Sequence, residues 1–141
     1  MLTALVALAL APASSFVHFK SPSGNINCIG APSGPAFVEC LVKSSTWPRK
    51  PPKPANCDLD WVPTEIDLSH RRVGVGACRG DIGPLCVNQP GDRCTTLGYG
   101  RSVTIGPIRC DSATTGVTCR YRTAPRVGFR IAREGYVLFR S

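Results

Sequence analysis

The chain has few aromatic residues and little helical periodicity, and both shortages limit the kind of fold it can form. Only 7% of its 141 residues are aromatic, against 14 glycines and 13 prolines. No segment longer than a few residues has apolar side chains at the three- and four-residue spacing of an amphipathic helix, so a helical bundle is excluded. A core this poor in large side chains needs additional stabilisation in a domain of this size.

Motifs for several kinds of chemistry are also missing. The chain has no Gly-x-Ser-x-Gly nucleophile elbow, no phosphate-binding loop and no Cys-x-x-Cys pair typical of zinc sites. Its two histidines, His18 and His70, are far apart in sequence. Ser69 and His70 are adjacent, so on a strand their side chains would point to opposite faces. We therefore predict no catalytic residues, no metal and no cofactor.

The first thirteen residues form an uncharged apolar run that ends in Ala11-Pro12-Ala13, a small-x-small pattern typical of signal peptidase sites. The run is shorter than the roughly 20 residues of a membrane-spanning helix. The positive charge that usually precedes such a run is missing, which leaves open whether Met1 is the true start. We predict a signal peptide over 1–13 and a single disulfide-rich β domain over 14–141, secreted or periplasmic, with no membrane span.

Cysteine is abundant, and an even number of cysteines behind a signal peptide predicts disulfides. Each disulfide contributes about 2–4 kcal/mol, which compensates for the thin core. The pairing is not fixed by sequence, but locality favours consecutive pairs, because turn-rich segments separate the first two cysteines and the last two. The expected pairs are Cys28–Cys40, Cys57–Cys78, Cys86–Cys94 and Cys110–Cys119.

Short alternating segments separated by glycine, proline, asparagine and aspartate predict a mainly β fold with an antiparallel sheet. In Val117–Arg122, residues 117, 119 and 121 would be buried and residues 118, 120 and 122 would face solvent. Ser102–Ile105, Ile108–Cys110 and Gly128–Ile131 are further expected strands of this sheet. After Ile131 the sequence allows one helical turn before a terminal strand, so we expect at most one short helix. The proline-rich stretch 47–54 is interpreted as an extended surface connector.

Seven segments carry a recognisable pattern: FKSPSGNINC (19–28), KPANCDLDW (53–61), YGRSV (99–103), GPIRC (106–110), TGVTC (115–119), GF (128–129) and REGYVLF (133–139). Together they resemble a family of small secreted bacterial proteins classed as a domain of unknown function. The resemblance implies a fold and a compartment, and no activity. The family pattern has six cysteines, so Cys86 and Cys94 are an additional pair around Pro90-Gly91-Asp92. Ala132 stands where the pattern has serine.

Two further functional hypotheses rest on local features. Asp58 and Asp60 stand beside Trp61, and with His70 they define the alternative of a small secreted hydrolase. The spacing of the two aspartates is more typical of a turn beside a packed tryptophan. The other alternative is a secreted inhibitor or toxin-like module that presents the Cys86–Cys94 loop.

Charge gives the leading functional hypothesis. The net charge is +8, and residues 101–141 contain eight arginines against Asp111 and Glu134. Guanidinium groups bind phosphate and carboxylate in bidentate fashion. We expect a non-enzymatic interaction module that binds an anionic envelope polymer or an acidic protein. The predicted compartment disfavours nucleic acid as a ligand. The alternative is a basic surface that only confers solubility. The candidate anion-binding residues are Arg101, Arg109, Arg120, Arg122 and Arg130.

Overall fold

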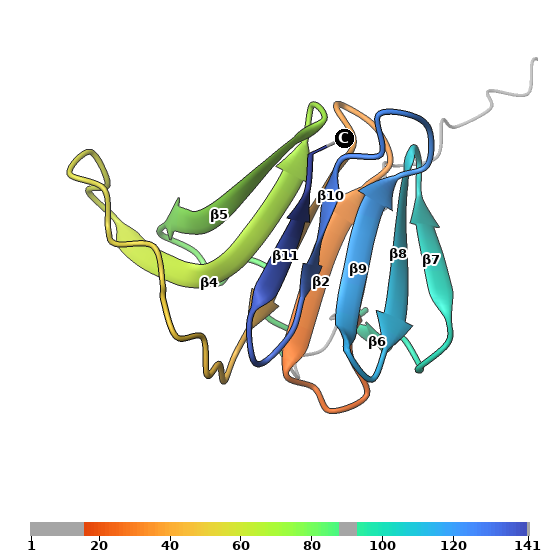
Figure 1. Ribbon diagram of the computed structural model, residues 1–141, viewed down its shortest axis with the longest axis horizontal. Helices are drawn as coiled ribbons and strands as arrows, with labels where there is room; N and C mark the ends of the chain where they lie inside the picture. Colours follow the sequence, from red (N-terminus) through yellow and green to blue (C-terminus); the bar gives the residue numbers. More distant parts are fainter. Residues whose placement is uncertain (1–15, 88–92, 141) are drawn as a thin grey trace, which may run out of the picture.

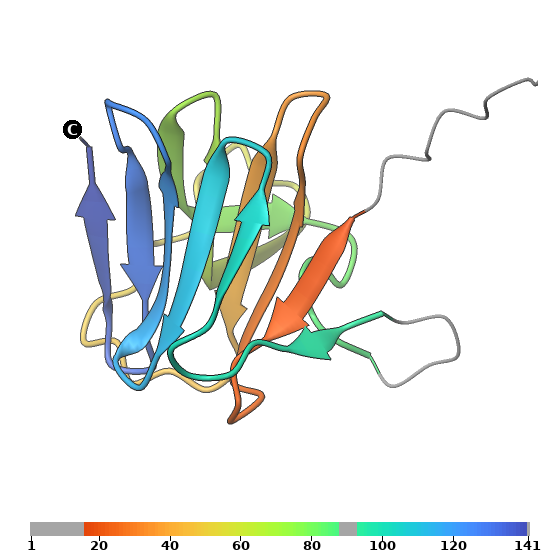
Figure 2. The ribbon, with the colours of Figure 1, turned by 90° about the vertical axis from the view of Figure 1, so that its right-hand side faces the viewer.

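The structure describes residues 16–87 and 93–140, which form eleven β-strands and no helix in this computed structural model. The strands build two layers that face each other across one core (Figure 1, Figure 2). This confirms the predicted mainly β, disulfide-stapled fold. The signal peptide predicted over 1–13 and the loop around residues 90–92 lie outside the described residues. Within the described ranges, no helix is long and apolar enough to cross a bilayer.

One layer is a six-stranded sheet in the order β5-β4-β3-β2-β1-β6. Its neighbours are antiparallel, except that β6 runs parallel to β1. The long β4–β5 hairpin extends beyond the other layer on one side (Figure 1). The strands are β1 (Val17–Lys20), β2 (Ile26–Ala31), β3 (Phe37–Val42), β4 (Asp60–Ser69), β5 (Arg72–Arg79) and β6 (Thr95–Thr96).

The other layer is an antiparallel five-stranded sheet in the order β11-β10-β9-β8-β7. It contains all the strands expected in the C-terminal third of the chain. The helical turn that the sequence allowed after Ile131 does not form: the Ala132 amide donates to the Gly135 carbonyl at 2.9 Å, which closes a short hairpin turn and pairs Ile131 with Tyr136. The strands are β7 (Ser102–Ile105), β8 (Ile108–Ala113), β9 (Gly116–Tyr121), β10 (Gly128–Ile131) and β11 (Tyr136–Phe139).

Two disulfides lie in the core, one in each sheet. Cys28 and Cys40 are directly opposite on β2 and β3, and Cys110 and Cys119 are directly opposite on β8 and β9, each pair with 4.1 Å between Cα atoms. All four sulfur-bearing side chains are buried. Because side chains alternate between the two faces of a strand, a slip of one residue would turn one sulfur outward. Each disulfide therefore fixes the register of a central hairpin.

The proline-rich connector is fastened at several points. Cys57, just after it, is disulfide-bonded to Cys78 on β5, and the Trp61 indole donates to the Pro51 carbonyl at 2.8 Å. Trp47 is buried, donates to the Ala132 carbonyl at 2.8 Å and packs on Tyr136 of β11. The connector thus crosses from the end of one sheet to the end of the other, without strand or helix of its own.

Arg71 joins the two sheets at the opposite end of the sandwich. It lies in the β4–β5 turn, where His70 and Arg71 have φ of 50° and 54°, a left-handed conformation that asparagine tolerates better. Its backbone amide donates to the Tyr121 hydroxyl at 3.0 Å, and its guanidinium lies 4.5 Å from the centre of that ring. The same guanidinium donates to the carbonyls of Thr123 and Pro125 at 3.2 and 3.0 Å.

We expect Arg71→Asn to lower the free energy of unfolding by about 1–3 kcal/mol, because it removes charge-assisted bonds between the sheets while retaining a residue suited to the turn. The matched control is His70→Asn in the same turn, for which we expect a change within about 0.5 kcal/mol. Denaturant unfolding measures both. Equal effects of the two substitutions would show that the turn conformation, and not the contact with the second sheet, provides the stability.

A partly buried ion network lies on the outer face of the six-stranded sheet. Arg79 binds both oxygens of Glu65, which is 1% exposed, and also contacts Glu39 at 3.0 Å and Asp81 at 2.8 Å. Burial raises the pKa of Glu65, and Arg79 offsets part of this rise. The carboxylates in turn raise the pKa of Arg79, which keeps it cationic. Asp67 lies directly opposite Glu39, and burial together with this like charge raises its pKa.

We expect Asp67→Asn to stabilise the protein at neutral pH by less than about 1 kcal/mol, because it removes a partly buried charge and its like-charge cross-strand contact with Glu39. The folded state holds the Asp67 proton more tightly than the unfolded state, so wild-type stability falls as pH rises through the raised pKa. The stability difference between Asp67→Asn and wild type should therefore vanish below the ordinary pKa of aspartate. Unfolding curves from pH 3 to 7 test this, with exposed Asp58→Asn as the control. A gain that is constant with pH would contradict the assignment.

Candidate anion-binding site

The outer face of the five-stranded sheet carries the arginines that sequence alternation placed there. On β9, Val117, Cys119 and Tyr121 are buried in the core, so Thr118 and Arg120 face outward. Arg122, just after the strand, is exposed. On the neighbouring strands, Arg109 of β8 and Arg130 of β10 are likewise exposed while the residues on either side of them are buried.

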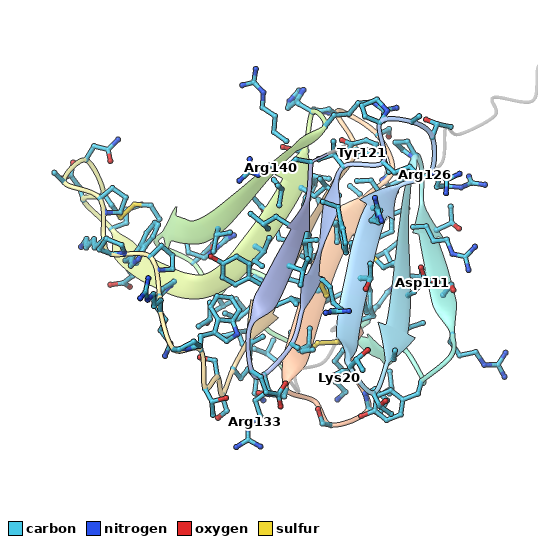
Figure 3. All side chains as sticks on the ribbon, in the orientation of Figure 1. Lys20, Asp111, Tyr121, Arg126, Arg133 and Arg140 are labelled. Atoms are coloured by element: carbon cyan, nitrogen blue, oxygen red, sulfur yellow. A yellow bond between two sulfur atoms is a disulfide. The ribbon has the colours of Figure 1, made fainter. Side chains whose placement is uncertain are left out.

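Four of the arginines surround one shallow depression of about 350 Å³, here called the arginine depression. It runs from Asp111 in the middle of β8 to Arg126 in the loop between β9 and β10 (Figure 3). A depression of this size is at the lower end of the range for small-ligand sites. Its lining consists of Arg109, Asp111, Arg120, Tyr121, Arg122 and Arg126.

Packing holds Arg120 in place across the sheet. Its guanidinium lies 4.1 Å from the centre of the Phe139 ring on β11, and its Nε donates to the Arg126 carbonyl at 2.8 Å. Between β9 and β11 the side chain passes over Gly128, where a Cβ atom would clash with the Cys119 carbonyl oxygen and meet Arg120 Cγ at 2.7 Å. The glycine therefore allows the close approach of β9 and also leaves room for the Arg120 side chain. The contact with Phe139 adds a cation–π attraction that fixes the guanidinium in position.

The depression has an excess of positive charge. Arg109 and Arg120 are directly opposite on β8 and β9, an arrangement of like charges that destabilises a sheet. Asp111 accepts from Arg109 at 3.1 Å, so this carboxylate partly compensates one arginine. Among the described residues, no carboxylate forms an ion pair with Arg120, Arg122 or Arg126. A bound anion would relieve the repulsion and accept from these guanidinium groups.

The structure separates the residues that we singled out as candidates for anion binding. Arg109, Arg120 and Arg122 line the arginine depression. Arg130 is on the same face but lines a different hollow near the turn after β10, and Arg101 is in the loop before β7. Arg126 was missed, because its position depends on how the loop after β9 folds back over the strand. The only sequence signal for it was its proximity to Arg120 and Arg122 along the chain.

The residues of the hydrolase hypothesis are not brought together. Asp58 and Asp60 are exposed at one end of the long β4, whereas His70 is in the turn at its other end. At about 3.3 Å per residue, the strand separates Asp60 and His70 by roughly 30 Å. The loop of the inhibitor hypothesis contains residues 88–92, which lie outside the described ranges.

One group that could hold a metal was also missed. His18 of β1 lies beside Cys86 and Cys94, and one ligand atom from each of the three lies within 4.8 Å of the others. The three residues are half-buried, and the two cysteines form a disulfide. The sequence favoured no metal site because the two histidines are far apart along the chain and no Cys-x-x-Cys pair occurs. The fold brings His18 to the Cys86–Cys94 pair.

Comparison with known families gives one match. The model described as "Family of unknown function (DUF6636)" matches residues 1–139. The chain belongs to the DUF6636 family. This confirms the resemblance to a domain of unknown function. No curated protein and no solved structure matches the chain. Membership of DUF6636 assigns no chemistry to the arginine depression, so any function must be argued from the site.

Proposed function

We propose that this DUF6636 protein is a non-enzymatic binding module that acts outside the cytoplasm and binds a phosphate-rich polymer of the cell envelope through the arginine depression. The observation that carries the proposal is the gathering of four arginines around one hollow in which Asp111 is the acidic residue. Simple solubility does not require basic side chains to converge in this way.

The rigidity of the site supports specific binding. Arg120 is held by Phe139 and by the Arg126 carbonyl, and Arg109 by Asp111 and Ser102. Ordering a long side chain on binding costs about 0.5–1.5 kcal/mol, and part of this cost is already met in the free protein. Arg122 and Arg126 are exposed and line the depression. The site thus combines two fixed guanidinium groups with two adaptable ones.

The covalent framework supports the compartment. Four disulfides occur in the chain, and disulfides persist in oxidising environments such as the periplasm and the extracellular space. The ligand we propose there is an envelope polymer that carries phosphate along its length. A planar guanidinium matches a phosphate group with two parallel hydrogen bonds, so neighbouring arginines can bind successive phosphates of one chain.

The test is binding of long-chain polyphosphate, used as the probe, at rising salt. We expect the double substitution Arg122→Gln/Arg126→Gln to weaken binding at least about tenfold, because each lost charge-assisted hydrogen bond costs about 1.5–3 kcal/mol. Both residues are exposed, so we expect the free energy of unfolding to stay unchanged.

The matched control removes the same charge from the connector. Arg49→Gln/Lys53→Gln lowers the net charge equally at exposed positions far from the depression along the chain, and we expect binding within about twofold of wild type. Equal weakening by the two double substitutions would show that only net charge matters and would refute the proposed site. Polyglutamate serves as a comparison polymer. If the protein bound polyglutamate more tightly than polyphosphate, the ligand would be a polycarboxylate and the proposed phosphate polymer would be refuted.

A further inference from the structure

His18, Cys86 and Cys94 form a second cluster of chemically active side chains, outside the arginine depression. We propose that this cluster is a redox-gated zinc site: when the Cys86–Cys94 disulfide is reduced, the two thiolates and the His18 imidazole bind one Zn²⁺ ion, and a fourth position stays open to water or a ligand. This inference is independent of the proposed anion binding.

The distance between the Cys86 sulfur and the His18 nitrogen fits zinc, and reduction of the disulfide frees the two sulfurs to move apart. Cys86 Sγ and His18 Nε2 are 3.6 Å apart, and one ligand atom from each residue lies within 4.8 Å of the others. With Zn–S and Zn–N bonds of about 2.3 and 2.0–2.1 Å, a tetrahedral ion places a sulfur and a nitrogen ligand roughly 3.6 Å apart. Two sulfurs and one nitrogen with an open fourth position are the ligand set of a catalytic type of zinc site.

The sheet holds the three ligands in place without the disulfide. His18 is on β1, in the ladder with β2. Cys94 directly precedes β6, which pairs with β1 through Phe19 and Thr95. The Cys86 amide donates to the buried Asn27 side chain at 2.8 Å. Because each ligand has its own attachment, reduction should leave the cluster assembled.

The gating chemistry is a balanced exchange. A dithiol reductant transfers two electrons and two protons to the disulfide, so that the Cys86–Cys94 bond breaks, two thiols form and the reductant becomes a cyclic disulfide. Zn²⁺ then displaces the two thiol protons, since thiolates are the species that bind metals. Re-oxidation consumes the sulfur ligands and releases the ion.

The histidine ring also changes state. In the oxidised protein Nε2 lies 2.8 Å from the Pro84 carbonyl, which only accepts, so Nε2 carries the proton and donates it. Zinc binding through Nε2 requires the tautomer protonated at Nδ1. The ring must therefore give up the bond to Pro84 when the metal enters. This switch gives a signature that a purely structural histidine would lack.

The experiment titrates Zn²⁺ against a chromophoric chelator, with the full chain either oxidised or treated with a dithiol under conditions that open the half-buried Cys86–Cys94 disulfide and leave the fully buried core disulfides closed, and then freed of reductant. We expect one Zn²⁺ per chain in the reduced protein and none in the oxidised protein. His18→Gln should weaken binding at least about 100-fold, since even outer-shell partners of metal ligands account for 10–100-fold. Co²⁺ in place of Zn²⁺ should give thiolate-to-metal charge transfer, and imidazole ¹⁵N shifts should report the tautomer change.

Two controls make the outcome decisive. His70→Gln changes the other histidine, and we expect it to bind Zn²⁺ like wild type. The variant Cys86→Ser/Cys94→Ser, reduced in the same way, shows how much zinc the other thiols bind. We expect this variant to lose the zinc site while remaining folded. The proposal is overturned if reduced wild type binds no Zn²⁺, if His18→Gln or the double serine variant binds as tightly as wild type, or if the double serine variant unfolds.

Discussion

Strand register is the constraint on which the rest of this structure depends, and it is fixed covalently. Cys28–Cys40 and Cys110–Cys119 each join residues that are directly opposite in a central hairpin, with the sulfurs in the core. Alternation along the strands then decides which side chains are buried and which face solvent. In a chain with only 7% aromatic residues, this covalent constraint supplements a core of mostly aliphatic side chains such as Ile66, Leu68 and Ile131.

The same register creates the charged surface. With Cys119 buried opposite Cys110, Arg120 must point outward and lie directly across from Arg109. The repulsion between the two is offset locally by Asp111 and by the Phe139 ring. The molecule thus holds an unfavourable concentration of positive charge on a rigid sheet. Sites at which structure is strained by like charges are often those at which a ligand of opposite charge binds.

Much of the fold could be predicted from sequence, because its rules are local. The alternation in Val117–Arg122 gave the correct faces, and turn-rich segments between neighbouring cysteines pointed to the pairs that the structure contains. The conformation of Ala132–Gly135 could not be predicted, because a four-residue segment can form either a helical turn or a hairpin turn. The pairing of the strands on both sides determines which of the two forms. Arg126 reaches the arginine depression through a loop, and His18 reaches the Cys86–Cys94 pair through pairing of strands that are distant in sequence. Residue spacing along the chain reveals neither contact.

Peptide mapping of the non-reduced protein by mass spectrometry tests the covalent register most directly. We expect cross-linked peptides that join Cys28 to Cys40 and Cys110 to Cys119, each within one hairpin. Free thiols at these positions, or a link from Cys28 or Cys40 to Cys110 or Cys119 across the two sheets, would contradict it.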